Sequence, residues 1–390
     1  MEDGKTETGA GSVLKGFRMR KEKVQLNKVL MLRSVFAIGG AERHIVILSG
    51  ELLDRGIGIE IGTAGGEGCS FSGMDRVKKI PIRLTPGTFR NLIFSSISLF
   101  KHVKRSEIQI IHSHQRFATL CAWFVSRILS VPLVSTEHGF FWERKFIVRL
   151  FQPDSFLTAT EKVKRHLIEY YKIRPEKISV IPNATIVGEN NRKNSKTKHE
   201  DSSMDTSINI CYGGRLSEEK GLLVLLDSWE MIAREYSEAH LWIIGDGIMR
   251  PEMEKIISTR GLSGRTTVTG FKKNVSEFLL SMDMVVLPSF TENMPMILLE
   301  AMACSIPVIV TDVGGISELV ENGEEGLLVK AGDCESLYNG MKTLIDNPEL
   351  RTKMGLMGRK KVSERFNSKM MGDKHIKFYK EVMKQYSGTK

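Results

Sequence analysis

The stretch MVVLPSFTENMPMILLEAMACSIPVIVTD, residues 284–312, contains the unit that decides the fold. It predicts a short apolar strand, a loop, a helix that begins at residues 294–295, and a second apolar strand. Pro295 stands where a first helical residue is favoured. Two strands joined through a helix are parallel and form a right-handed βαβ unit. Apart from Glu300, the helix is apolar on every side from Met296 to Ala303, which predicts complete burial.

The same alternation of strands and helices occurs in two blocks, and 390 residues exceed what one hydrophobic core usually supports. We therefore expect an α/β protein of two Rossmann-like domains, residues 27–183 and 207–366. Each has a doubly wound parallel sheet, and the two face each other across a central cleft. Residues 184–206 are polar and predict a linker. Residues 1–26 predict a flexible basic tail, and residues 367–390 a helix that crosses back to the N-terminal domain.

The cysteines and the apolar runs indicate a cellular location. The five cysteines are odd in number and show no CxxC spacing, which argues against a disulfide framework and a structural zinc site. Residues 1–26 do not resemble a signal peptide, and no segment predicts a membrane span. We expect a cytoplasmic protein that can lie peripherally on the inner face of the cell membrane.

The charge predicts an anionic partner. With 56 Lys and Arg against 46 Asp and Glu, the formal charge is +10, which suits nucleic acid, phosphorylated small molecules or a membrane surface. Residues 86–152 combine many cations and aromatic side chains with three acids. This mixture is typical of a surface that contacts anionic lipid.

Two acids lie within the apolar stretch, Glu292 at its start and Glu300 inside the helix. A buried carboxylate costs several kcal/mol or so unless hydrogen-bond donors meet it. Because helical side chains lean toward the N-terminus, we expect Glu300 to point toward the loop that holds Glu292. The helix N-terminus attracts phosphate, so the site fits a sugar nucleotide. The alternative is a capping Glu292 and a structural Glu300 paired with an arginine.

Glu292 and Glu300, spaced E-x7-E after LPS and followed by AMACSIPVIVTDVGG, resemble the signature of family 4 glycosyltransferases. The resemblance extends from residue 28 to about residue 380. It implies the GT-B fold and transfer of a hexose or N-acetylhexosamine with retention of configuration. The implied donor is a nucleoside diphosphate sugar, expected to be a UDP-sugar. The implied acceptor is a lipid-linked saccharide or polysaccharide of cell-surface glycan synthesis, and no cofactor or metal is expected.

GGRLSEEKG, residues 213–221, resembles the phosphate-binding segment of that family. It places Gly214, Arg215 and Lys220 at a strand-to-helix turn where two cations can converge on a diphosphate. In the resemblance Arg215 and Lys220 stabilise the leaving group, and Glu292 positions the sugar. The alternative is a pair of surface charges at a helix start.

Further donor-binding candidates lie around Pro295 and at two other strand ends. Asn293 replaces a glycine that is frequent in the family, and the remaining candidates are Met294, Met296, Gly245, Asp246 and Phe271. The segments IGDG and VTGF, which supply the last three, could equally be tight turns.

In the N-terminal domain Gly39 and Gly40 lie between the first strand and its helix. They do not form a GxGxxG fingerprint, because the loop is too short and the acid Glu60 falls inside the second strand. In the resemblance this loop faces the donor phosphates and the acceptor. The alternative is a simple strand-to-helix turn.

Histidines follow two consecutive strands of the same domain. His138 matches the histidine of the family's HG motif and is the catalytic candidate, while His114 is a candidate on the acceptor side. Glu161 is another acceptor-side candidate, although it could be an acid that favours a helix N-terminus. With His112 the histidines number three, but their spacing does not predict a zinc site.

Two other functions remain open. A sugar-nucleotide epimerase could use the same two-domain architecture, and it would change the donor sugar without any acceptor. A nucleic-acid binder is suggested by charge alone. We expect no nucleic-acid partner because no recognisable nucleic-acid-binding module is present.

Overall fold

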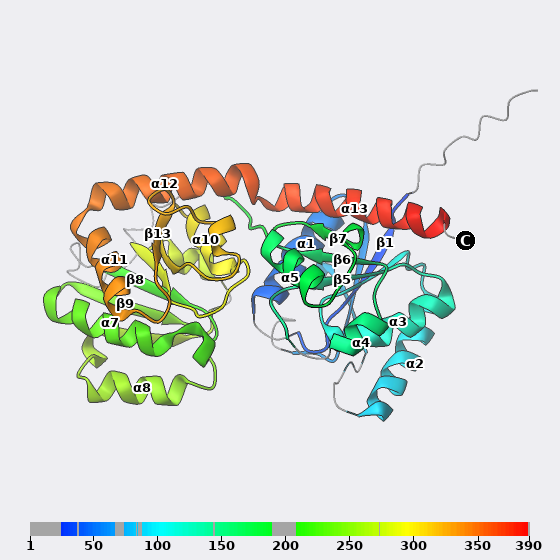
Figure 1. The fold of residues 1–390 in the computed structure, drawn as a ribbon, viewed down its shortest axis with the longest axis horizontal. Helices are drawn as coiled ribbons and strands as arrows, with labels where there is room; N and C mark the ends of the chain where they lie inside the picture. The colour runs from blue at the N-terminus through cyan, green and yellow to red at the C-terminus, as the bar shows by residue number, and fades with distance from the viewer. Residues whose placement is uncertain are drawn as a thin grey trace, which may run out of the picture.

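The computed structural model contains two α/β domains that lie side by side (Figure 1). The described residues are 25–36, 39–66, 74–82, 84, 88–142, 145–188, 208–272 and 274–388. Residues 1–24 of the predicted tail and 189–206 of the predicted linker lie outside them. The first two linker residues, Ala184 and Thr185, are buried, and Thr185 forms a β-bridge to Asn367.

The N-terminal sheet has seven strands in the order β3-β2-β1-β4-β5-β6-β7, and every neighbouring pair is parallel. Its strands are β1 (Lys28–Leu32), β2 (Gly58–Thr63), β3 (Lys78–Pro81), β4 (Ile110–Ser113), β5 (Leu133–Glu137), β6 (Ser155–Thr158) and β7 (Ile178–Val180). Side chains of β1 alternate between two cores. Val29 and Met31 belong to one, while Leu30 and Leu32 belong to the other. This strand is therefore buried on both faces, as a central parallel strand must be.

The C-terminal sheet has six parallel strands in the order β10-β9-β8-β11-β12-β13. Its strands are β8 (Ile208–Gly213), β9 (Ala239–Ile244), β10 (Thr266–Gly270), β11 (Met284–Leu287), β12 (Val308–Thr311) and β13 (Gly326–Val329). Both sheets follow the Rossmann order, in which the chain reverses direction across the sheet at one switch point. The predicted fold of two doubly wound parallel-sheet domains is confirmed.

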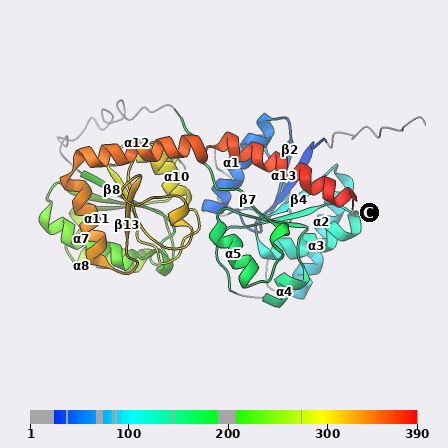
Figure 2. The same cartoon turned by 45° about the horizontal axis from the view of Figure 1, so that its top comes forward.

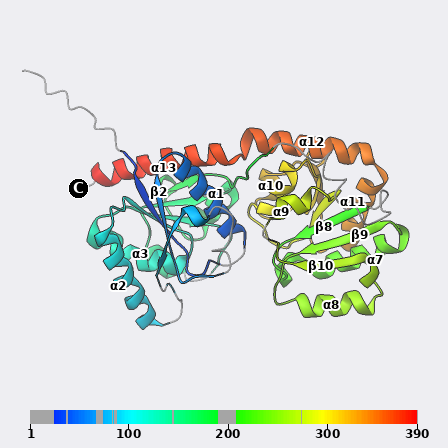
Figure 3. The same ribbon diagram turned by 180° about the vertical axis from the view of Figure 1, so that it is seen from behind.

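Helices cover both faces of each sheet (Figures 2 and 3). In the N-terminal domain they are α1 (Gly40–Asp54), α2 (Phe89–Arg105), α3 (Arg116–Leu129), α4 (Lys145–Leu150) and α5 (Glu161–Glu169). In the C-terminal domain they are α7 (Leu222–Glu235), α8 (Arg250–Thr259), α9 (Val275–Leu279), α10 (Met296–Ala303) and α11 (Cys334–Asp346). Helix α7 packs on α11, and α2 packs on α3.

Two long helices run end to end along one side of both domains, at the top of Figure 1. Helix α12 (Pro348–Arg365) packs on α10, and α13 (Ser368–Gly388) packs on α1 of the N-terminal domain. Arg55 of α1 forms an ion pair with Asp373 of α13, with Nε and Oδ1 2.8 Å apart. The C-terminal helix therefore tethers the two domains to each other.

Some elements differ from the sequence-based expectation. Residues Ile316–Glu318 form only a 3-10 turn, η6, between β12 and β13. The strand β3 and the helices α2, α4 and α12 were not predicted. No helix in the described part of the chain combines the length and the apolar character that crossing a membrane requires.

The two switch points place the candidate residues. In the N-terminal sheet the switch lies between β1 and β4, which are followed by Gly39–Gly40 and by His114. In the C-terminal sheet it lies between β8 and β11, which are followed by the segment with Arg215 and Lys220 and by the loop with Glu292. Ligands of such folds bind outside the carboxyl ends of the strands at this point.

Candidate active site

Lys220 and Glu292 form an ion pair between the two switch-point loops of the C-terminal domain. The Nζ of Lys220 lies 2.7 Å from Oε1 of Glu292, which also accepts a hydrogen bond from Ser289 Oγ at 2.8 Å. Gly221, with φ +67°, follows Lys220, and a Cβ there would lie 2.1 Å from the carbonyl oxygen of Pro288. The turn requires glycine because the two loops approach so closely. A half-buried cation and a buried carboxylate are thereby fixed side by side.

The N-terminus of α10 lies beside this pair. Helix α10 begins at Met296, so the predicted start at residues 294–295 is wrong by one or two residues. Pro295 has an extended backbone, with ψ of 132°, and is the N-cap rather than the first helical residue. No side chain caps the first turn. The first turn of the helix therefore presents backbone N–H groups without a side-chain cap, and such groups attract an anion.

Glu300 is 5% exposed and contacts a cation from the other domain. The Nε of Arg43, in the first turn of α1, lies 2.8 Å from Glu300 Oε1. Burial raises the pKa of Glu300, while the charge and hydrogen bond of Arg43 lower it. The predicted alternative, an arginine partner for Glu300, is present. Since this arginine crosses the domain interface, the pair also joins the two domains at the site.

Asn293 links the same loop to the N-terminal domain. Its Oδ1 accepts a hydrogen bond from Thr160 Oγ1 at 2.6 Å, and its Nδ2 donates to the carbonyl oxygen of His138 at 3.1 Å. Asn183 Nδ2 donates to the carbonyl oxygen of Met294 at 2.8 Å. The loop between Glu292 and α10 therefore packs directly on the segments that carry His138 and α5.

Gly40 and Met296 also meet at this interface. A Cβ at Gly40 would lie 3.5 Å from Met296 Cγ, so the start of α1 contacts the start of α10. Gly39 is the N-cap of α1 and faces the carboxylate of Glu42, which is buried and pairs with Arg33 at 2.9 Å. The two predicted glycines thus lie where the domains approach each other.

Glu161 lies at the N-terminus of α5, as the alternative interpretation expected. It is the first residue of α5, its side chain is exposed, and its Oε2 lies 3.7 Å from Lys164 Nζ. The backbone N–H groups of Glu161 and Lys162 donate to the carboxylate of Glu318, at 2.8 and 2.9 Å. Glu318 of the C-terminal domain therefore caps the N-terminus of α5 across the interface.

His112, His114 and His138 belong to one cluster of histidines. His114 Nδ1 lies 3.1 Å from His138 Nε2, and the rings of His112 and His114 have centroids 4.1 Å apart. Two further members, His44 of α1 and His375 of α13, were not among the residues predicted from the sequence. The centroid of His44 lies 5.4 Å from that of His138 and 5.8 Å from that of His375. Only the i, i+4 patterns of their helices could have suggested that these two face the core.

The clustered imidazoles are neutral at neutral pH. Burial, with a smaller effect of Arg33, lowers the pKa of His138 to about 3. Burial also lowers the pKa of His375 to about 4. The pKa values of His44, His112 and His114 lie well below the usual value, because of burial first and of charge repulsion between the rings second.

The hydrogen bonds favour one tautomer of His138. Nε2 of His114 is buried and has no hydrogen-bond partner among the described residues. A buried N–H without an acceptor is rarer than an unpaired acceptor, so the proton of His114 belongs on Nδ1, which faces His138 Nε2. His138 then carries its own proton on Nδ1. In this state it can donate a hydrogen bond to a ligand and is a poor general base.

The remaining candidates lie at the edge of the site. Arg215 follows Gly214 and is exposed, and its carbonyl oxygen accepts a hydrogen bond from Tyr212 at 3.0 Å. Asp246 is exposed, bonds the N–H of Gly247, and pairs with Arg250 of α8 at 2.9 Å. Gly245 precedes Asp246, and Phe271 is half-buried beyond β10. The contacts of Asp246 are those of a turn.

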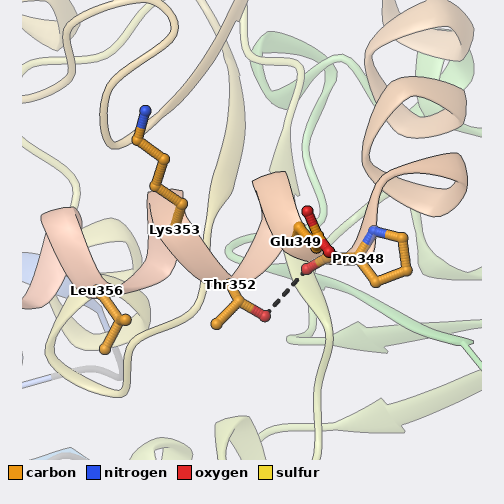
Figure 4. Close-up of a pocket in the computed structure, with 5 residues that line it drawn as sticks. All are labelled: Pro348, Glu349, Thr352, Lys353 and Leu356. Carbon is orange, nitrogen blue, oxygen red and sulfur yellow. Dashed lines mark hydrogen bonds between the residues drawn. The ribbon is translucent and has the colours of Figure 1, made fainter.

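Two other features do not contribute to the site. Within the described ranges, no group of three or more His, Cys, Asp or Glu side chains is arranged to hold a metal ion. A shallow depression on α12 is lined by side chains from successive turns of that helix, namely Pro348, Glu349, Thr352, Lys353 and Leu356 (Figure 4). Its Thr352 hydroxyl bonds the carbonyl oxygen of Pro348 at 2.9 Å. The depression contains none of the candidate residues.

Known proteins resemble this chain over most of its length. An alpha-D-kanosaminyltransferase of Streptomyces kanamyceticus is 26% identical over 312 residues, which cover 72% of this chain and 80% of the relative. The UDP-Gal:alpha-D-GlcNAc-diphosphoundecaprenol alpha-1,3-galactosyltransferase of Escherichia coli is 26% identical over 308 residues, 74% of this chain and 79% of the relative.

Solved structures share the fold. Anabaena HepE in complex with UDP and glucose has a TM-score of 0.78 at 20% identity, covering 90% of this chain and 99% of that one. A glycosyltransferase of Rickettsia africae has a TM-score of 0.77 at 19% identity, covering 92% and 99%. The family model for glycosyl transferases group 1 matches residues 165–361, and the model for Glycosyltransferase Family 4 matches residues 38–186. The C-terminal part of the chain thus matches the group 1 model, and its N-terminal part matches the family 4 model. The chain therefore belongs to the glycosyltransferases of the GT-B fold.

Proposed function

We propose that this protein is a retaining glycosyltransferase that moves a hexose or N-acetylhexosamine from a UDP-sugar to a lipid-linked saccharide or polysaccharide. The observation that carries the proposal is the Lys220–Glu292 pair beside the uncapped N-terminus of α10. A diphosphate can take over the cation and the helix N-terminus together. Glu292 is then released to accept hydrogen bonds from sugar hydroxyls.

The nucleoside occupies the region of Glu300. Its ribose hydroxyls are donors, and the buried Glu300 is an acceptor that already holds one donor, Arg43. A carboxylate has room for several donors, so the ribose can bind while Arg43 remains in contact. The choice of uridine is supported by HepE, which was crystallised with UDP-glucose.

The reaction proceeds on one face of the sugar. The bond between the anomeric carbon and the diphosphate oxygen breaks as the acceptor oxygen bonds to the same carbon, and the acceptor proton passes to the departing diphosphate. Lys220, Arg215 and the N-terminus of α10 stabilise the charge that develops on the leaving oxygen. His138 donates from Nδ1 and orients the sugar. The contacts of Asn293, Arg43 and Glu318 across the interface exclude water.

The acceptor class is supported by the E. coli relative, whose name specifies a diphosphoundecaprenol-linked acceptor. A lipid-linked saccharide places the acceptor hydroxyl near a membrane surface. The proposal therefore predicts that acceptors with a polyprenyl diphosphate are used better than free sugars.

The test combines binding with product analysis. Thermal shift against UDP, GDP and ADP and their sugars identifies the donor, because a ligand of the folded state raises Tm. We expect UDP-sugars to give the largest shift in the wild type and a smaller one in Lys220→Ala. NMR of the product should show the same anomeric configuration as the donor.

Two results would contradict the proposal. An inverted product would exclude the retaining mechanism. Conversion of the donor sugar to its epimer without any acceptor would instead identify an epimerase. The variant Lys255→Ala, in which an exposed lysine of α8 is removed, is the matched control and should behave as the wild type.

A further inference from the structure

Helix α2 buries Leu99 and Val103 of its second half in the core but exposes several apolar side chains of its first half. Phe89 is 75% exposed and Phe94 64% exposed, whereas Ser95 is buried. Ile93 and Ile97 are also exposed, and with Phe89 they follow an i, i+4 spacing along one stripe. Core packing does not explain this arrangement, because the stripe faces away from α3 and the sheet. It is an unpartnered apolar surface on the first half of the helix.

The second half of the same stripe is cationic. Lys101, Lys104 and Arg105 are exposed in the last turns of α2, and Arg90 is exposed in the first. Four cations in α2, two in α3 and two in α4 occur without any Asp or Glu in these three helices. Cations near an apolar stripe are the pattern of a helix that lies in a lipid interface.

Helix α4 and Trp142, three residues before it, expose further apolar side chains. Trp142 is 64% exposed and Phe146 76% exposed, and Ile147 and Leu150 are exposed beside them. Phe151, which follows α4, contacts Trp123 of α3 with ring centroids 5.0 Å apart. In Figure 1, α2 and α4 lie on the side of the N-terminal domain opposite to α13. The chain reaches Trp142 four residues after His138.

The six cations of α2 and α4 are available to a partner. Within the described residues, Arg116 and Arg127 of α3 pair with Glu137 and Asp154, and the cations of α2 and α4 have no such partner. Lys104 and Lys145 instead lie over the rings of Phe100 and Tyr170. A nucleic acid would use these cations but would gain nothing from the exposed isoleucines. A phospholipid surface uses both.

We propose that the exposed faces of α2 and α4, with Trp142, form a docking surface for anionic phospholipid. The aromatic and aliphatic side chains enter the headgroup region, and the cations contact the lipid phosphates. The surface borders the segment of His138, so docking holds the acceptor side of the enzyme at the membrane. The proposal concerns this surface alone and does not rest on the identity of the donor.

Vesicle sedimentation tests the proposal with the full chain. The probes are vesicles of phosphatidylcholine alone and of phosphatidylcholine mixed with phosphatidylglycerol. We expect binding to the anionic vesicles only, with weakening at high salt. Two double variants divide the surface into its components. Phe94→Ser with Ile97→Ser removes apolar contact, and Lys104→Glu with Arg105→Glu reverses charge. Each should lower the bound fraction about tenfold.

The matched control is Ile248→Ser, which removes an 85% exposed isoleucine from the C-terminal domain and should leave binding unchanged. Equal binding of wild type and both double variants would overturn the proposal. So would a wild-type dimer in sedimentation equilibrium that the variants convert to monomer, because the surface would then join two copies of the chain. Transfer to a short water-soluble acceptor should be retained in the variants, which separates this test from that of the catalytic proposal.

Discussion

The two domains share one strand order but supply different chemistry to their interface. At its switch point the C-terminal domain presents Lys220 and Glu292, two charged groups held 2.7 Å apart. The N-terminal domain presents His114 and His138, two imidazoles that burial keeps neutral. The charged half suits a diphosphate leaving group, and the neutral half suits a hydrogen-bonded sugar. The shared topology fixes where a ligand binds, while the loops after the strands determine what it can be.

The largest effect should come from the charged half. Lys220→Ala removes the cation that, in our proposal, meets the leaving group, and it leaves Glu292 buried with Ser289 alone. We expect kcat to fall about a thousandfold, which is typical for loss of one preorganised electrostatic contact. Steady-state kinetics with saturating donor measure this. Lys220→Arg keeps the charge and should recover part of the rate; a mild effect of Lys220→Ala would remove the leaving-group role.

The second prediction concerns the ion pair between Arg43 and Glu300, which joins the two domains. Glu300→Gln keeps the size of the side chain but loses the charge that meets Arg43 and, in our proposal, the ribose. We expect the dissociation constant for UDP to rise about tenfold to a hundredfold, since hydrogen bonds to a charged group are the stronger ones. Calorimetric titration gives the constant. Wild-type affinity in Glu300→Gln would mean that the acid serves only the Arg43 contact.

The sequence predicts local units of the fold but not the contacts between the domains. The βαβ unit around α10 was foreseeable because strand, loop and helix are adjacent in the chain. Arg43 was not, because its contact with Glu300 spans 257 residues. Helix α2 could have been predicted, because its apolar residues recur with a helical spacing. Helix α12 packs through Gly355, where a Cβ would lie 2.1 Å from the carbonyl oxygen of Ser305.

The third prediction tests whether the halves must be held together. Asn293→Ala removes the hydrogen bonds to Thr160 and to the backbone of His138. Closure becomes less favourable by the loss of two contacts, so we expect kcat/KM to fall about tenfold. Asn293→Asp keeps the acceptor for Thr160 and should lose less. Small-angle scattering should show a larger radius of gyration for Asn293→Ala, and an unchanged rate in this variant would mean that closure does not depend on the loop.

The smallest effect is the acid sensitivity of the neutral half. An imidazole with a folded pKa below its unfolded value of about 6.5 stabilises the fold above that pH. The unfolded chain binds more protons as the pH falls, so stability is lost from about 6.5 down toward the folded pKa. That limit is about 4 for His375 and about 3 for His138. Each such group contributes a slope of about 1.4 kcal/mol per pH unit.

Thermal denaturation between pH 7.5 and pH 5, roughly spanning the onset of this titration, measures the slope. His375→Asn removes one titrating ring and should make the fall in Tm with acid shallower. Thr266→Val is the control, because it removes the buried acceptor of the 2.9 Å hydrogen bond from Trp229 Nε1 and involves no titrating group. It should lower Tm equally at every pH. If the wild type kept its Tm throughout this range, the imidazoles would have to be hydrated rather than buried, and the neutral half would lose its distinction from the charged one.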